Sequence, residues 1–224
     1  MNIPYRFSAV LGHICFTLFG DWQVSGKLCV PPLGPLIVVS NHISNADPPV
    51  LISSIPRQLA FLAKDDLFNN PMLNMFFKSI GAHPLSRSGP DVGAMRWASR
   101  MINKDHAVLL FPEGTRSITG TLRRGLPGSA YLALQTQAPI LPVAITGTER
   151  IPGFWRVAFP MANIRVKIGR PFTLPQIDGR PSKAILQSLS DMIMMRIADL
   201  LPPDYRGYYA SSLTFPSNDA DATP

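Results

Sequence analysis

The chain has 224 residues, enough to bury one sizeable core, and we expect a single domain. Charged residues make up 16% of it and hydrophobic residues 46%, less charge than the roughly 25% of an ordinary soluble domain, which favours an apolar partner. The formal net charge of +7 favours anionic partners such as acidic lipids or phosphorylated substrates, while the dispersed basic residues, without an RNA-stacking signature or zinc-finger spacing, argue against nucleic acid.

Residues 1–30 precede a short proline-rich connector and are expected to form a membrane-associating segment distinct from the main domain. The apolar run at 8–19 is interrupted by Gly12 and His13 and is shorter than the 20 or so residues that span a bilayer. We therefore expect a short helix in the membrane interface, with Arg6 near the lipid headgroups. The alternative is a helix that packs on the protein's own core. On the first reading the protein is peripheral, on the cytoplasmic face of the cell membrane.

Cys15 and Cys29 are the two cysteines of the chain, and neither belongs to a CxxC pair or a histidine-rich cluster. The spacing predicts neither a disulfide framework nor a structural zinc site. We expect two reduced thiols in a cytosolic setting and no metal site.

Strands and helices are expected to alternate along the main domain. Short apolar runs ended by polar or turn residues are typical of buried strands, and they occur at 36–39, 59–63, 107–111 and 140–145. The segments between them predict helices at 48–55, 71–79, 91–103 and 127–136. This alternation predicts an α/β fold, a single-domain sheet covered by helices, in which loops at strand ends carry the chemistry.

The C-terminal part of the domain shows two further patterns. Residues 163–169 alternate with a period of two, which predicts a half-exposed strand. Residues 182–200 predict a closing amphipathic helix. We expect the main domain to cover 31–208, and the stretch 209–224 to be a disordered tail because it is poor in order-promoting residues.

The stretch SNHISNADPP places His42 and Asp47 where the first buried strand ends and a helix marked by Pro48 begins. Five residues at 3.6 per turn put two side chains about 140° apart, so a turn, not a continuous helix, must bring them together. Asp47 fits a helix N-cap, whose carboxylate accepts the first free N–H groups. It equally fits a partner that fixes the tautomer of His42 and leaves the other ring nitrogen free as a base. The two roles can coexist.

The stretch FPEGTRS, residues 111–117, again puts charged residues directly after a buried strand. Glu113 and Arg116, with Gly114 permitting close backbone approach, can bind a polar anionic group. The alternative is an internal pair between Glu113 and Arg116 in a tight turn.

Two more cations stand near the ends of other segments. Lys64 closes the run FLAK, and Arg87 ends the loop GAHPLSR. Together with Arg116 they place three cations at the ends of separate strands, and this arrangement predicts an anion pocket.

Four blocks of the sequence resemble the glycerolipid acyltransferases typified by 1-acylglycerol-3-phosphate (lysophosphatidate) acyltransferase. The stretch from His42 to Asp47 resembles the H-x4-D block of that family, and three further blocks resemble 81–87, 111–117 and 140–143. Their order and separations match, over roughly residues 20–172. H-x4-D by itself is a common pattern, whereas FPEGTRS at this distance downstream is specific.

The resemblance implies transfer of a fatty acyl group from an acyl thioester, acyl-CoA or acyl carrier protein, to the free hydroxyl of 1-acyl-glycerol-3-phosphate. The product would be phosphatidate, formed at a membrane surface without a cofactor. His42 would act as the general base and Asp47 would orient it.

The same resemblance implies a site for the phosphate and glycerol of the acceptor, formed by Lys64, Arg87, Glu113, Gly114, Thr115 and Arg116. The charge of Glu113 is wrong for a phosphate ligand, so it is expected to hold an arginine or to meet a glycerol hydroxyl. Pro142 is implied to lie on the acyl-donor side, although a core strand would explain this residue equally well.

One departure from the family pattern concerns the acceptor. After FPEGTRS the usual Phe-Lys before the glycine is replaced by the stretch GLPG, residues 125–128, and Arg123 and Arg124 either supply the missing cation or are solvated. Other acceptors therefore stay open: glycerol 3-phosphate, another lysophospholipid or a lipid amine. A lipid-binding module without catalysis would share the same surface, but the intact His42 and Asp47 argue against it. A serine hydrolase is disfavoured because no G-x-S-x-G elbow is present.

Overall fold

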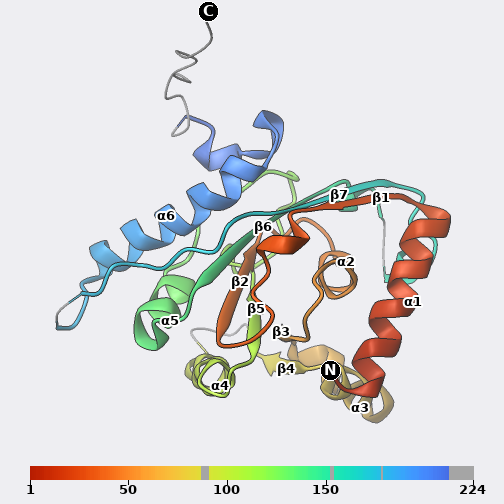
Figure 1. The fold of residues 1–224 in the computed structure, drawn as a ribbon, viewed down its shortest axis with the longest axis horizontal. Coiled ribbons are helices and arrows are strands. Elements are labelled where there is room, and N and C mark those ends of the chain that lie inside the picture. The colour runs from red at the N-terminus through yellow and green to blue at the C-terminus, as the bar shows by residue number, and fades with distance from the viewer. Residues whose placement is uncertain (87–90, 152–153, 178, 212–224) are drawn as a thin grey trace, which may run out of the picture.

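In the computed structural model, which describes residues 1–86, 91–151, 154–177 and 179–211, the described strands form one mixed sheet with helices on both faces (Figure 1). The strand order is β1-β7-β6-β2-β5-β3-β4. The strands are β1 (Asp21–Ser25), β2 (Leu36–Ser40), β3 (Leu59–Lys64), β4 (Ala82–Leu85), β5 (Ala107–Leu110), β6 (Ile140–Thr146) and β7 (Asn163–Ile168).

Five neighbouring strands, from β6 to β4, run parallel, whereas β7 is antiparallel to β6 and carries β1 beside it. Every residue of the central strands β2 and β5 is buried. Strands covered on both faces read as continuous apolar runs, which is why the sequence revealed them. The carboxyl ends of the five parallel strands lie at one edge of the sheet.

Helices cover the two faces in two groups of three (Figure 1). One face carries α1 (Ile3–Phe19), α2 (Asp47–Ser54) and α3 (Pro71–Ser79), and the other carries α4 (Val92–Ile102), α5 (Gly128–Thr136) and α6 (Lys183–Leu200). Successive β2 side chains alternate between the two apolar cores, with Val38 in one and Val39 in the other. The predicted α/β sheet covered by helices is therefore confirmed.

The strands β1 and β4 were not predicted from the sequence. β1 is an edge strand whose residues are exposed or half-buried, so it lacks an apolar run. β4 is the other edge strand and contains Pro84, which has no N–H to donate to a ladder. Edge strands tolerate both features, and local patterns therefore miss them.

The inner face of α1 packs into the core rather than standing apart as an appendage. Tyr5 and Phe16 are fully buried. The hydroxyl of Tyr5 accepts a hydrogen bond from the peptide N–H of Leu59 (3.0 Å) and donates one to the carbonyl of Arg57 (3.2 Å). A side chain on Gly12 would meet the Ser53 hydroxyl of α2 at 2.3 Å, so Ser53 would have to turn away to admit any larger residue. The inner face of α1 therefore packs on the protein's own core, as the alternative interpretation of this segment predicted.

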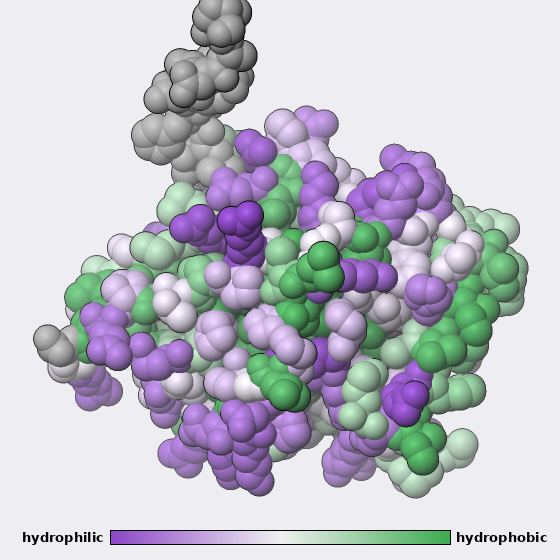
Figure 2. Space-filling view, in the orientation of Figure 1, coloured by the Kyte–Doolittle hydropathy of each residue, from purple (hydrophilic) through white to green (hydrophobic). Residues whose placement is uncertain are grey.

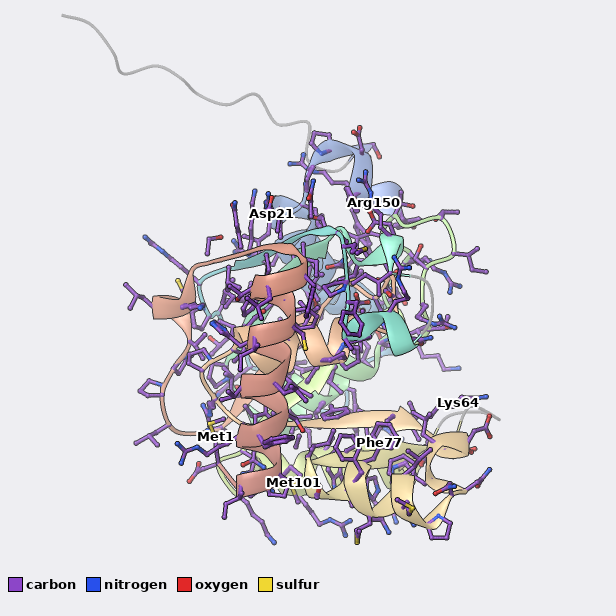
Figure 3. All side chains as sticks on the ribbon, turned by 90° about the vertical axis from the view of Figure 1, so that its right-hand side faces the viewer. Met1, Asp21, Lys64, Phe77, Met101 and Arg150 are labelled. Atoms are coloured by element: carbon purple, nitrogen blue, oxygen red, sulfur yellow. The ribbon has the colours of Figure 1, made fainter. Side chains whose placement is uncertain are left out.

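The outer face of α1 exposes large apolar side chains along its whole length. They recur at helical spacing and are Ile3, Phe7, Val10, Leu11, Ile14 and Leu18. In Figure 2 the edge of the molecule over α1 is mostly hydrophobic, and in Figure 3 the helix crosses the front face from Met1 towards Asp21. Within the described residues no helix is both long and apolar enough to cross a bilayer. The membrane-interface role of α1 stays a prediction.

The last described segment docks on the domain. A short 3-10 turn, Gly207–Tyr209, places Tyr209 against the second core, where its side chain is 2% exposed. Its hydroxyl donates to Asp191 of α6 (2.7 Å) and accepts from the peptide N–H of Gly125 (3.0 Å). The expected tail boundary after residue 208 thus falls one residue before a buried tyrosine, and most of the tail, 212–224, lies outside the described residues.

Candidate active site

The loops that leave the carboxyl ends of β2, β5 and β6 meet at one edge of the sheet, beside the end of β3. The loop after β2 carries His42, the loop after β5 carries Glu113, and the loop after β6 carries Thr148. Residues far apart in the sequence therefore converge, because parallel strands end at the same edge.

His42 and Asp47 meet through the turn that the sequence required. The two residues lie on either side of a short irregular turn, and Asp47 is the first residue of α2. The His42 Nδ1 atom lies 2.8 Å from Asp47 Oδ2. The ring is 12% exposed, whereas the carboxylate is completely buried. Because Asp47 occupies Nδ1, Nε2 is the ring nitrogen left for a substrate.

The predicted N-cap role of Asp47 is wrong. Its Oδ2 atom accepts hydrogen bonds from the peptide N–H groups of Ile43 (2.7 Å) and Ser44 (2.8 Å), which precede the helix. The N-cap of α2 is Ala46, which makes no side-chain capping bond. A helical side chain leans towards the N-terminus of its helix, so the first helical residue reaches back over the preceding turn. The carboxylate therefore organises the His42 loop instead of capping α2.

The other carboxylate oxygen of Asp47 has a partner from a distant part of the chain. Thr148 donates its hydroxyl to Asp47 Oδ1 at 2.5 Å, and its side chain is completely buried. Neither oxygen of the buried carboxylate is left without a donor, which offsets the cost of desolvating the charge.

The backbone of His42 is held by the loop after β5. Its N–H donates to Glu113 Oε1 (2.9 Å), and its carbonyl accepts from the N–H of Ser117 (2.7 Å). The imidazole stacks on the ring of Phe111, with centroids 4.1 Å apart and planes inclined by 20°. Main chain and ring are thus both fixed by the FPEGTRS segment.

Glu113 lies behind the site and is 3% exposed. Its second oxygen, Oε2, accepts from the peptide N–H of Arg123 (3.0 Å). Burial raises the pKa of the Glu113 carboxyl to about 7, against the opposing effect of these backbone hydrogen bonds. The expected pair with Arg116 is not among the ion pairs of the described residues. Glu113 instead joins the His42 loop to the Arg123 loop.

Asn41 fastens the same loop to β6. Its side-chain amide donates to the carbonyl of Ile145 and accepts from the N–H of Ile145, both at 2.8 Å. A side chain thereby continues the pairing of β2 with β6 beyond the last ladder bond. The sequence analysis did not single out this role.

A largely apolar cavity of about 380 Å³ adjoins His42. Its walls come from α1, α2 and α3, from the strands β3, β4 and β5 and from short loops beside them, and include Ser8, Ile52, Phe61, Phe77, Ile80 and Leu109. His42, Lys64 and Gly114 line it at the carboxyl ends of the strands. In Figure 3 the labelled Phe77 lies beside the lower half of α1, and Lys64 lies farther out along β3. His42, the exposed member of the His42–Asp47 pair, therefore borders a largely apolar space.

The predicted cations differ in their surroundings. The ammonium of Lys64 pairs with Asp66 and is about half exposed. Arg116 is exposed to solvent, and Thr115 beside it is half-buried. Arg87 lies outside the described residues. The structure thus brings Lys64 to the cavity and leaves Arg116 at the solvent side of the same loop cluster.

Gly114 is required by the backbone. Its φ of +71° lies in the left-handed region, and a Cβ atom there would stand 2.5 Å from a methyl carbon of Leu126. The residue keeps the FPEGTRS turn tight where it meets the cavity.

Pro142 lies inside β6, buried and in register with Val39 of β2. It is not among the residues that line the cavity. This position fits the core-strand reading, and its implied place on the acyl-donor side stays a prediction.

The two arginines after FPEGTRS differ as well. The guanidinium of Arg124 lies 3.5 Å from a carboxylate oxygen of Asp191 and over the ring of Tyr208. Arg123 is exposed and contributes its peptide N–H to Glu113. Of the two, Arg123 is the one whose charge is left facing solvent without an ion pair among the described residues.

Thr148, like Asn41, was not predicted from the sequence as part of the site. The available signal was its position, since it follows β6 by two residues and parallel strands deliver their following loops to one edge. Nothing in the local pattern TGTER specifies a partner 101 residues earlier.

The family model described as Acyltransferase matches residues 21–146. The chain is 26% identical to the 1-acyl-sn-glycerol-3-phosphate acyltransferase of Bacillus subtilis (strain 168) over 88% of this chain and 96% of that protein. It is 32% identical to the chloroplastic enzyme BAT2 of Brassica napus, over 52% of this chain and 34% of the relative.

A solved structure shares the fold. The crystal structure of the 1-acyl-sn-glycerophosphate (LPA) acyltransferase PlsC from Thermotoga maritima superposes with a TM-score of 0.68 at 27% identity. The match covers 88% of this chain and 79% of that one. The strands β1 to β6 and the loops that carry His42 and Glu113 fall within the stretch that the family model matches.

Proposed function

Since the chain belongs to the acyltransferase family and is an O-acyltransferase, we propose that it moves a fatty acyl group from an acyl thioester to the free hydroxyl of 1-acyl-glycerol-3-phosphate, giving phosphatidate. The observation that carries the proposal is the His42–Asp47 pair, 2.8 Å apart and bordering an apolar cavity. The names of the relatives in Bacillus subtilis and Brassica napus support this acceptor.

In the proposed reaction the acceptor's own alcohol is the nucleophile. His42 Nε2 takes the proton of that hydroxyl while its oxygen bonds to the thioester carbonyl carbon. The tetrahedral intermediate then breaks its C–S bond, and the imidazolium returns the proton to the leaving thiolate. Asp47 stabilises the imidazolium from the Nδ1 side. A positioned base typically contributes about 10²–10⁴-fold, and orientation of the two substrates supplies much of the rest.

The phosphate of the acceptor is proposed to bind on the solvent side of the loop cluster. Lys64, Arg116 and Arg87 are the cations assigned to it, together with Gly114 and Thr115. Glu113 supports this site from behind, because its oxygens already accept two peptide N–H groups. A negatively charged phosphate is attracted by such a set of cations through charge-assisted hydrogen bonds.

The apolar cavity is proposed to hold a fatty acyl chain. Its walls are mostly Phe, Leu, Ile and Pro side chains, and His42 borders it. Burial of each CH₂ group contributes about 0.8 kcal/mol, so a long chain gains most of its binding free energy there.

The exposed apolar face of α1 is proposed to lie in the membrane interface. The neighbouring helix α3 exposes Met72, Met75 and Phe76, and α1 contacts α3. Two adjacent helices with apolar outer faces, on a chain of formal charge +7, suit an anionic bilayer surface.

Purified protein incubated with acyl-CoA or acyl carrier protein thioesters and lysophosphatidate is expected to release free thiol and form phosphatidate, measured by mass spectrometry. Glycerol 3-phosphate, a neutral lysolipid and a lipid amine serve as competing acceptors. If one of these reacts faster than lysophosphatidate, the proposed acceptor is wrong while acyl transfer stands.

Changing His42→Ala is expected to lower kcat by at least about 10²-fold, because it removes the base. His106→Ala, an exposed histidine before β5, is the matched control and should retain activity. Liposome binding should survive both changes. A wild-type protein that binds liposomes but never releases thiol from any donor would mean a lipid-binding module instead of an enzyme.

A further inference from the structure

We propose that Thr148 is a positioning residue for this reaction: its hydroxyl fixes the Asp47 carboxylate, which in turn holds His42 in the orientation of a general base. The inference rests on the proposed function and deepens it. Thr148 lies outside the four sequence blocks that carry the family resemblance, and it approaches the catalytic pair from the strand on the other side of β2 from β5.

The contact itself is short and buried. Thr148 Oγ1 lies 2.5 Å from Asp47 Oδ1, and both side chains are completely buried. A carboxylate only accepts, so the threonine hydroxyl is the donor. The distance falls in the range of charge-assisted O–H···O⁻ hydrogen bonds. Thr148 is the one hydrogen-bond partner that the described residues give Asp47 Oδ1. Removing the hydroxyl would leave this buried, charged oxygen without that donor.

Thr148 controls the orientation of the carboxylate because the two oxygens have different partners. Oδ2 receives His42 Nδ1 and the peptide N–H groups of Ile43 and Ser44. The terminal torsion of an aspartate is broad, so donors on one oxygen alone leave the carboxylate plane free to turn. A donor on Oδ1 from the opposite direction closes off that rotation and keeps Oδ2 on the imidazole.

The threonine is itself held independently of the His42 loop. Gly147 beside it has a φ of +89°, and a Cβ there would lie 1.9 Å from the carbonyl oxygen of Asn163, so β6 and β7 meet too closely for any side chain. On the other side, Tyr205 donates its hydroxyl to Glu149 (2.8 Å). The position of Thr148 is therefore set by β7 and the C-terminal segment.

Two variants without the hydroxyl, Thr148→Val and Thr148→Ala, should lower kcat by about 10- to 100-fold, the equivalent of one lost hydrogen bond to a charged group. KM should change by less than about twofold, since Thr148 touches no substrate. Thr148→Ser, which keeps the donor, should restore kcat. Thr136→Val removes a half-buried threonine hydroxyl bonded to a backbone carbonyl in α5 and should leave kcat unchanged.

A spectroscopic readout separates this proposal from the proposed function. The proton between His42 Nδ1 and Asp47 should give a downfield ¹H NMR signal in the wild type and in Thr148→Ser, and it should shift or broaden in the Val and Ala variants. Unchanged kcat and an unchanged NMR signal in folded Val and Ala variants would overturn the role of Thr148. A wild-type protein inert towards every donor and acceptor would instead defeat the acyl-transfer proposal, and the NMR signal would still decide the role of Thr148.

Discussion

The two sides of His42 are built on opposite principles. On one side lie polar loops in which both oxygens of Asp47 and of Glu113 have defined partners at 2.5–3.0 Å. On the other side lies a cavity of about 380 Å³ whose walls make few directional contacts. Hydrogen bonds fix atoms to within tenths of an ångström, whereas an apolar wall fixes only shape. Under the proposed function, the positions of the reacting groups are therefore fixed closely, whereas the bound acyl chain is restricted only by the shape of the cavity.

On the polar side, the largest effect is expected from Asp47→Asn. The asparagine amide has an N–H₂ group in place of one carboxylate oxygen, and this group cannot accept the hydrogen bonds that Asp47 receives. The change therefore disturbs both the His42 tautomer and the Thr148 contact. We expect kcat to fall by about 10³–10⁴-fold for every acyl chain length. Asp199→Asn, on an exposed part of α6, is the control and should be active. A loss confined to one chain length would mean that the polar side also measures the lipid.

A second test of the polar side uses the pH dependence of stability. The pKa of Glu113 is about 7 in the folded protein and near 4.5 when unperturbed, so the folded state binds its proton more tightly than the unfolded state. The stability it contributes is full below pH 4.5 and is lost as pH rises through 7, on the order of 3 kcal/mol. Glu113→Gln should remove this part of the slope.

Urea unfolding from pH 4 to pH 8 measures that slope in the two proteins. Glu149→Gln replaces the other glutamate of the chain, which lies near the surface, and should leave the slope as in the wild type. Parallel curves for wild type and Glu113→Gln would contradict the raised pKa.

The apolar side is tested through Ile80, which lines the cavity near the amino end of β4, away from His42. Ile80→Phe should shorten the cavity and shift kcat/KM towards shorter acyl chains by about 10- to 30-fold, while Ile80→Ala should favour longer ones. Ile102→Phe, in the core on the opposite face of the sheet, costs stability without changing chain preference. Equal loss for all chain lengths in both Ile80 variants would place the acyl chain elsewhere.

The smallest expected effect concerns the helix that closes the apolar side. Tyr5→Phe removes the hydroxyl that links α1 to Leu59 and Arg57 and should lower the free energy of unfolding by about 1 kcal/mol. Tyr131→Phe, on the exposed face of α5, should have no such effect. Hydrogen exchange at Leu59 should rise in the first variant only, and a rise in both would show that the bond does not hold the helix.

The core of the fold could be predicted from the sequence because the central parallel strands β2, β5 and β6 are buried on both faces and leave apolar runs that a local pattern reveals. The edge strands β1 and β4 could not, since an edge tolerates exposed residues and Pro84. The inner face of α1 packs on the core, as the alternative predicted, whereas the interface role of its exposed apolar face stays a prediction. The sequence pattern alone could not assign the two faces of this helix.

For the site, the sequence could supply the residues but not their partners. The turn between His42 and Asp47 followed from helical geometry and is present. The prediction that Asp47 caps α2 was wrong because the helix starts one residue earlier than expected, at Asp47 itself. The side chain of the first helical residue points back over the preceding turn. Thr148 was invisible because its contact is set by strand order, a property of the whole sheet.

One feature of α1 has a mechanical consequence. Ser8 lines the cavity while the adjacent Phe7 is exposed, so at this point the thickness of one helix, about 10 Å, separates the cavity from the surroundings. A tilt of α1 would therefore open the cavity sideways, at a distance from the hydrogen-bonded loops at the strand ends.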